Sequence, residues 1–133
     1  TNMLGHVLQL AQARTPPEKI RILAKEANEL RTRTQTVVRA ADLPDLRTLA
    51  TVNDLADQYC RLLEDGVIKR ASDVPAQERR DVLRPIAEQL VQAGEETNGL
   101  AQQKPTLRAA LEKMAAAARK GDKQLRGLLK ETS

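Results

Sequence analysis

The sequence is nearly free of aromatic side chains. Among its 133 residues there is no tryptophan, no phenylalanine and a single tyrosine, Tyr59. Alanine and leucine, with 19 residues each, supply most of the apolar side chains instead. Small and branched aliphatic side chains suit closely packed helices, and they offer little surface for stacking a nucleic-acid base or a flat cofactor.

Cysteine and histidine are almost as scarce, with one residue of each, Cys60 and His6. A single cysteine excludes an internal disulfide and a metal site built from cysteines, and it fits a reducing cytosolic environment. We expect Cys60 to be a small buried thiol and His6 to be an ordinary surface or core residue. A catalytic cysteine–histidine pair is therefore not expected.

Motifs that carry catalysis or hold cofactors are missing as well. The sequence has no glycine-rich phosphate loop, no His-Glu-x-x-His and no Glu-x-x-His of the kind that binds metals inside helical bundles. We therefore expect a chain that is not an enzyme and that holds no cofactor and no metal ion. No apolar run approaches the ~20 residues that span a bilayer, and no signal-peptide core appears. Because the sequence starts at Thr1 without methionine, we expect a domain excised from a larger protein.

Charged residues are abundant and only mildly unbalanced. Basic residues number 22 and acidic residues 18, which gives a formal net charge of +4 and a pI of about 9.5. Fourteen of the bases are arginines, whose planar guanidinium suits phosphate and carboxylate groups. The excess permits an anionic partner. Nucleic acid is the least favoured such partner, because the bases alternate with acids and form no stripe.

Apolar residues recur at helical spacing along almost the whole chain. A first short helix is predicted within residues 3–14. A second is predicted over residues 16–41, because Thr15 can cap it, Pro16 suits its first position and Glu18 completes a capping box.

The third helix is predicted over residues 44–69. Asp42 stands where it can cap this helix, and Gly66 is expected to begin the fraying of its end. Its predicted apolar seam comprises Leu46, Leu49, Val52, Leu55, Ala56, Tyr59, Leu62, Leu63 and Val67.

Pro85 makes the start of the fourth helix ambiguous, because a proline inside a helix costs about 3 kcal/mol. In the favoured solution, residues 74–80 form a separate helical turn that begins at Asp73 and Pro75. Asp81 then caps the next helix and leaves Pro85 in its first turn. In the alternative, one helix runs through Pro85 with a kink.

The last two long helices show the same apolar spacing, with the fourth ending near Gln103 and the last beginning at Pro105. Four long amphipathic helices with short connections predict an all-α fold, an elongated antiparallel up-down four-helix bundle with a short extra N-terminal helix. We expect residues 1–133 to form this single domain. The predicted seams are Leu83, Ile86, Leu90, Ala93, Thr97 and Leu100, then Leu107, Leu111, Met114, Ala118, Gly121, Leu125 and Leu128.

An antiparallel bundle brings alternate connections to one end, so residues 14–19, the loop 69–80 and the C-terminus are expected to share a tip. This tip is predicted to bind anions, in particular lipid headgroups, because bases beside exposed aliphatic residues suit such a site. Charged loops that only meet solvent are the simpler interpretation. The residues predicted for the tip are Arg14, Lys19, Ile68, Lys69, Arg70, Val74, Arg79 and Arg80, with Val67 exposed beside them.

An aromatic-poor bundle rich in alanine, leucine and arginine, with basic residues Lys69, Arg70, Arg79 and Arg80 at one tip, resembles a known class. It is similar to the four-helix-bundle membrane-localisation domains of secreted bacterial toxins and effectors. Those domains bind anionic phospholipid at the inner face of host membranes through one tip. The resemblance covers the whole chain and implies a non-catalytic module that brings an effector to phosphoinositide or phosphatidylserine at the host plasma membrane.

Two other functions remain open from the sequence. One is a protein-interaction or adaptor domain that uses an exposed helix face. The other, ranked last, is weak binding of nucleic acid.

Overall fold

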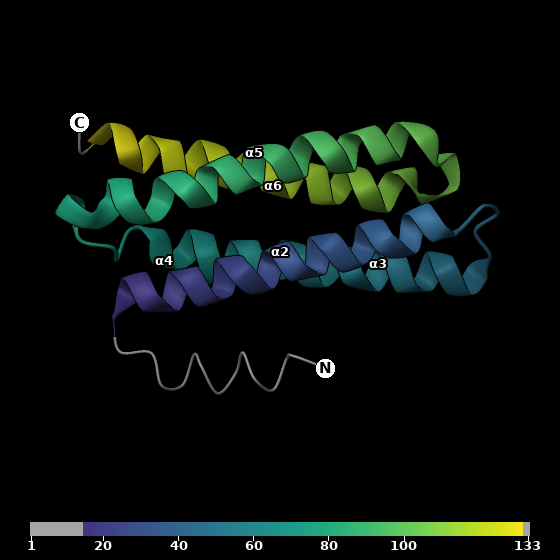
Figure 1. Cartoon of the computed structure of the whole chain (residues 1–133), viewed down its shortest axis with the longest axis horizontal. Helices are drawn as coiled ribbons and strands as arrows, with labels where there is room; N and C mark the ends of the chain where they lie inside the picture. Colours follow the sequence, from purple (N-terminus) through teal and green to yellow (C-terminus); the bar gives the residue numbers. More distant parts are fainter. Residues whose placement is uncertain (1–14, 132–133) are drawn as a thin grey trace.

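Four long helical segments make up most of residues 15–131, which are the residues that the computed structural model describes (Figure 1). The second segment is continuous, because α3 passes through the π-helical η1 into α4. The elements are α2 (Pro16–Ala40), α3 (Leu46–Arg61), η1 (Leu62–Ile68), α4 (Lys69–Ala71), the 3₁₀ turn η2 (Ala76–Glu78), α5 (Arg79–Gln103), the 3₁₀ turn η3 (Pro105–Leu107) and α6 (Arg108–Glu131). An all-helical fold with four long helices is thus confirmed for these residues. The short helix predicted within residues 3–14 lies outside them.

The four segments lie along the long axis of the molecule (Figure 1). At one end α2 and α5 begin, and α4 and α6 end. The opposite end holds the α2–α3 loop and the turn between α5 and α6. The most extensive pairing is between α5 and α6. The helix α2 packs on α3 and on α5, and α3 also packs on α6.

The helix starts follow the predicted capping signals at one position and depart from them at another. The Thr15 side chain caps α2 as predicted, because its Oγ1 accepts from the backbone N–H of Glu18 at 3.3 Å. The prediction of Asp42 as the next cap is wrong. Asp45 immediately precedes α3, and its Oδ1 accepts from the N–H of Thr48 at 2.8 Å, so Asp45 has the spacing that a cap requires.

The start of α5 combines parts of both predicted solutions. A separate short turn, η2, does precede the helix, but Asp81 is not the cap, since α5 already begins at Arg79. Pro85 therefore lies inside the helix. The proline removes the hydrogen bond to the carbonyl of Asp81 and its ring crowds that oxygen. Both residues are exposed, so water can reach the carbonyl.

Asp73 does not begin a helix either. Its backbone N–H donates to the carbonyl of Arg70 at 3.0 Å and so closes the end of α4. Pro75 takes an extended conformation just before η2.

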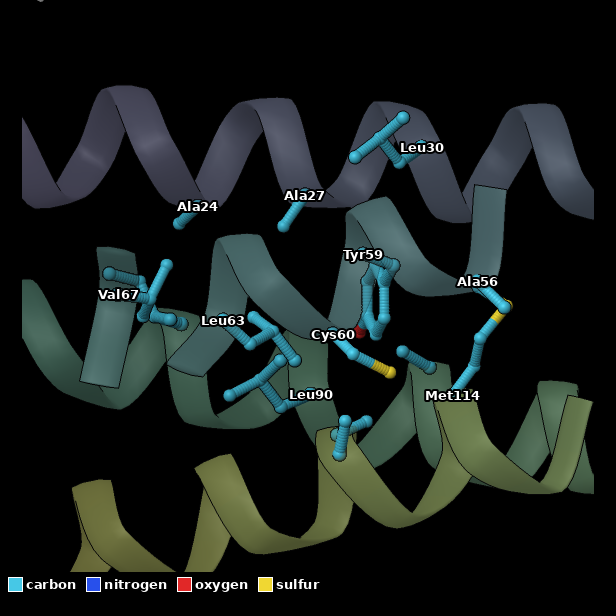
Figure 2. Close-up of a cluster of buried hydrophobic side chains, with 14 of the residues drawn as sticks. Ala24, Ala27, Leu30, Ala56, Tyr59, Cys60, Leu63, Val67, Leu90 and Met114 are labelled. Carbon is cyan, nitrogen blue, oxygen red and sulfur yellow. The ribbon is translucent and has the colours of Figure 1, made fainter. Parts of the chain in front are cut away.

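The predicted seams form the core. Every predicted seam position of α5 is buried, and so are those of α6 except Leu128, which is half-buried against the core. Tyr59 and Leu63 lie between the alanines of α2 and Leu90 of α5 (Figure 2). The inclusion of Leu46 in the third seam is wrong, because that side chain is 85% exposed.

The π-helical segment explains how the third seam stays on one face. Four buried residues, Tyr59, Leu63, Val67 and Ala71, follow one another at intervals of four. In an α-helix of 3.6 residues per turn such a series drifts by about 40° at each step. The wider turn of a π-helix, with its i→i+5 bonds, reduces this drift. Gly66 lies within the π segment, buried against Leu23, so the predicted fraying at Gly66 is wrong.

Candidate functional site

The end of the molecule where α4 ends and α5 begins carries most of the predicted site residues. We call this end the basic tip and define it by Lys69 and Arg70 of α4, the loop 72–78, and Arg79 and Arg80 of α5. The first turn of α2, with half-buried Lys19, lies at the same end (Figure 1). Arg14, also predicted for the site, lies outside the described residues.

Arg79 is turned back onto its own loop. Its Nε donates to the carbonyl of Val74 at 3.1 Å and one terminal nitrogen donates to the carbonyl of Ser72 at 3.3 Å. The other terminal nitrogen is 3.5 Å from the carboxylate of Glu131 at the end of α6. The Arg79 side chain is 16% exposed, so it holds the loop in place and presents little charge to solvent.

The other three bases of the tip differ in exposure and none of them is bound to the loop as Arg79 is. Lys69 and Arg80 are exposed, and Arg70 is half-buried with a hydrogen bond of 3.3 Å to the carbonyl of Asp65. Within residues 15–131, none of the three forms an ion pair with a carboxylate. By contrast, Arg126 in the last turns of α6 pairs with Asp122 at 2.6 Å.

Two of the three aliphatic side chains expected beside these bases are not available to solvent. Val67 and Val74 are 0% and 1% exposed, so the prediction that they are exposed is wrong. Val67 belongs to the seam of η1, and Val74 is drawn into the core as the loop folds beneath Arg79. Ile68 is half-buried and reaches toward Gly121 of α6. The tip is therefore a charged surface without an apolar projection of its own.

An open groove of about 370 Å³ lies between α2 and the α3–η1 segment. Its floor is apolar and its rim carries both signs of charge. It was not predicted, because Leu23 and Leu62 follow the seam spacing and gave no sign of a depression. The residues that line it are Leu23, Glu26, Leu30, Gln58, Arg61, Leu62, Asp65, Gly66 and Arg70.

Two large apolar side chains are exposed at the opposite end of the molecule, in and beside the α2–α3 loop. Leu43 is 93% exposed and Leu46 is 85% exposed. The exposure of this pair was not predicted, because Leu46 falls in register with the seam of α3. The proline and two aspartates around the leucines, in the order Asp-Leu-Pro-Asp-Leu, were the available sign of a loop that keeps them out of the core.

Chemically reactive groups are scarce in the described part of the chain. Burial raises the pKa of the Cys60 thiol, which disfavours the reactive thiolate. Within residues 15–131 no group of histidine, cysteine and carboxylate side chains is placed to hold a metal ion. The same residues contain no helix that is both long enough and apolar enough to span a bilayer.

Comparisons with known protein families, with curated proteins and with solved structures found no match to this chain. A functional proposal for this chain therefore depends on its own geometry and charge.

Proposed function

We propose that this chain is a non-catalytic localisation module, an antiparallel up-down four-helix bundle that docks its basic tip on anionic membrane surfaces. The observation that carries the proposal is the set of three bases at one end, Lys69, Arg70 and Arg80, with which no described carboxylate forms an ion pair, although Asp73, Glu78 and Asp81 are exposed in the same loop and helix start. The alternating ends of the helices in Figure 1 support the up-down arrangement.

The attraction is electrostatic. A lysine or arginine close to an anionic leaflet contributes about 1 kcal/mol. The N-termini of α2 and α5 lie at the same end and add partial positive charge there. Because Val67 and Val74 are buried, this tip inserts no apolar side chain, and its binding should weaken strongly with salt.

The lipids that fit this tip are phosphatidylserine and the phosphoinositides, whose headgroups carry the negative charge of the cytoplasmic leaflet. The resemblance to membrane-localisation domains of bacterial effectors extends the proposal to the inner face of a host plasma membrane. There the module would be a peripheral anchor for the protein to which it belongs.

The test is co-sedimentation with phosphatidylcholine vesicles that contain phosphatidylserine or a phosphoinositide. The variant Lys69→Glu/Arg80→Glu reverses the two exposed charges of the tip. Arg79 is left in place, since its hydrogen bonds hold the loop together. Binding by the wild type and its loss in the variant support the proposal.

The matched control is Lys25→Glu/Arg33→Glu, which reverses two exposed charges on α2, away from the tip. Both variants have the same net charge, so a difference between them reports position and not total charge. Equal binding by the two variants, or absence of binding by the wild type, refutes the proposal.

The groove between α2 and the α3–η1 segment favours a second candidate, a protein-interaction domain. Its apolar floor and charged rim suit an amphipathic helix with leucine-sized anchors at helical spacing. A second copy of this chain could supply such a helix. Sedimentation of the wild type and of Leu62→Asp tests this. A dimer that the substitution dissociates supports the candidate, and a monomer at all concentrations counts against it.

A further inference from the structure

Leu43 and Leu46 stand outside the core that every long helix otherwise helps to build. At 93% and 85% exposure they are the large apolar side chains that the described structure leaves in solvent. They lie at the end of the molecule opposite to the basic tip (Figure 1). Both leucines contribute little buried area to the fold, so stability does not explain them.

The loop that presents the leucines is held at its two ends, at Ala41 and at Asp45. Lys104, just after α5, donates from its Nζ to the carbonyl of Ala41 at 2.7 Å. The N–H of Ala41 donates to Val38 at 3.3 Å, and Asp45 is bonded to both the N–H and the hydroxyl of Thr48. A loop fixed in this way loses little further conformational entropy when its leucines meet a surface.

The charges around the leucines are mixed, with a basic excess. Arg39 and Arg47 are exposed on the adjoining turns of α2 and α3. The opposing charges are Asp42, which is exposed, and Asp45, whose carboxylate is committed to Thr48. On the α6 side, Arg108 is paired with Glu112 at 3.4 Å. Lys104, half-buried beneath the loop, adds to the positive side.

We infer that the α2–α3 loop is a second membrane contact, which inserts Leu43 and Leu46 between the headgroups of an anionic lipid surface while Arg39 and Arg47 meet the phosphates. Exposed apolar side chains flanked by bases fit the boundary between headgroups and acyl chains. The two ends of the molecule then bind lipid by different forces, apolar at the loop and electrostatic at the basic tip.

Together the two ends allow the module to bridge two lipid surfaces, and this consequence rests on the proposed function of the basic tip. A helix of 25 residues, the length of α2, spans about 38 Å. When one end stands on a membrane, the other is therefore clear of it and can meet a second one.

Insertion of the loop can be read directly, because the chain has no tryptophan of its own. Leu43→Trp places a single fluorophore in the loop, and Ala116→Trp, on the exposed face of the middle of α6, is the matched control. With phosphatidylserine vesicles, the emission at position 43 should shift to the blue and be quenched by brominated acyl chains, while that at position 116 should not. Unshifted emission at position 43 on protein that sediments with the vesicles at about 1 M salt, where binding through the basic tip is screened, overturns the inference.

The second readout uses Leu43→Ser/Leu46→Ser. At about 1 M salt, exposed charges are screened within ~3 Å. The vesicle affinity that the wild type retains there should be lower in the variant, by about tenfold for each leucine removed. At low salt this variant should still bind through the basic tip but should not cluster vesicles. Clustering equal to that of the wild type, or a wild type that binds no vesicle, overturns the inference.

Failure of the basic tip has a different signature. In that case Lys69→Glu/Arg80→Glu binds as the wild type does, while the loop variant loses binding at every salt concentration. Bridging by two ends is then refuted and the loop contact stands.

Discussion

Arg79 reaches back five residues to Val74, and its Nε donates to the carbonyl oxygen of that residue at 3.1 Å. Because of this contact, Arg79 differs from the other three bases of the tip. Arg79 holds the loop, whereas exposed Lys69 and Arg80 and half-buried Arg70 form no ion pair with a described carboxylate. The same loop keeps Val74 buried, which leaves the tip charged and without an apolar projection.

The hydrogen bonds from Arg79 to its loop predict that substitutions of two neighbouring arginines differ in their effect on stability. Arg79→Ala removes charge-assisted hydrogen bonds to two carbonyls and should lower the free energy of unfolding by about 1–3 kcal/mol. Arg80→Ala, at an exposed position, should change it by no more than about 0.5 kcal/mol. Urea denaturation of the two variants measures the difference. Equal effects would show that Arg79 does not hold the loop.

Two glycines of α6 should differ in how much they tolerate larger side chains. A Cβ at Gly127 meets nothing within 4 Å, so Gly127→Ala should raise the free energy of unfolding by about 1 kcal/mol through helix propensity. A Cβ at Gly121 lies 3.0 Å from Cδ1 of buried Leu90. Gly121→Ala should gain less, and Gly121→Val should lose about 1–3 kcal/mol by overpacking. Thermal or urea denaturation checks the order, and a Gly121→Val variant as stable as the wild type would contradict the close α5–α6 approach.

The buried phenol of Tyr59 leads us to expect that the folded protein loses stability at alkaline pH. Burial raises its pKa far above its ordinary value, an effect that the nearby charge of Arg31 only partly offsets. A phenol with a raised pKa in the folded state stabilises that state below its unfolded pKa of about 10, and the stabilisation is lost as the pH rises further. Because Tyr59 is the sole tyrosine, its ultraviolet absorbance reports ionisation without overlap.

The folded protein should show no tyrosinate absorbance near pH 11, and the urea-unfolded protein should titrate near pH 10. Tyr59→Phe should flatten the decline of unfolding free energy over that range. A native titration near pH 10 would mean that Tyr59 is open to solvent.

The interactions of Glu96 lead us to expect a smaller loss of stability at acidic pH. Burial raises its pKa, but a hydrogen bond from Gln35 and the charge of Arg31, with further bonds, leave the pKa below its ordinary value. A lowered folded pKa gives stability that is present above the unfolded pKa of about 4.3 and is lost as the pH falls through the folded pKa. Since the Glu96 side chain is 37% exposed, Glu96→Gln should lower the free energy of unfolding by less than about 1 kcal/mol at pH 7. The same substitution should flatten the decline of that free energy as the pH falls.

The sequence was sufficient to predict the four long helices and most of the core. Its periodicity identified the buried positions of α5, and Thr15 marked the start of α2. These features are local, so residues close in sequence determine them. The cap of α3 was misplaced by three residues because Asp42 and Asp45 are equally good capping residues, and only the path of the loop distinguishes them.

The candidate site was less predictable, because exposure depends on tertiary packing. Whether Val74 faces solvent depends on how the loop folds beneath Arg79, and no local pattern specifies that. Leu46 has the spacing of a seam residue, yet the first turn of α3 extends beyond the neighbouring helices that could cover it. The groove beside Leu62 arises between helices and likewise has no local signature.

The most direct test of the central claim is the ratio of vesicle affinities of the two charge-reversed variants, measured with phosphatidylserine vesicles at about 0.15 M salt. Loss of two surface-proximal bases removes about 2 kcal/mol, so Lys69→Glu/Arg80→Glu should bind at least about thirtyfold more weakly than Lys25→Glu/Arg33→Glu. A ratio near one would contradict docking through the basic tip.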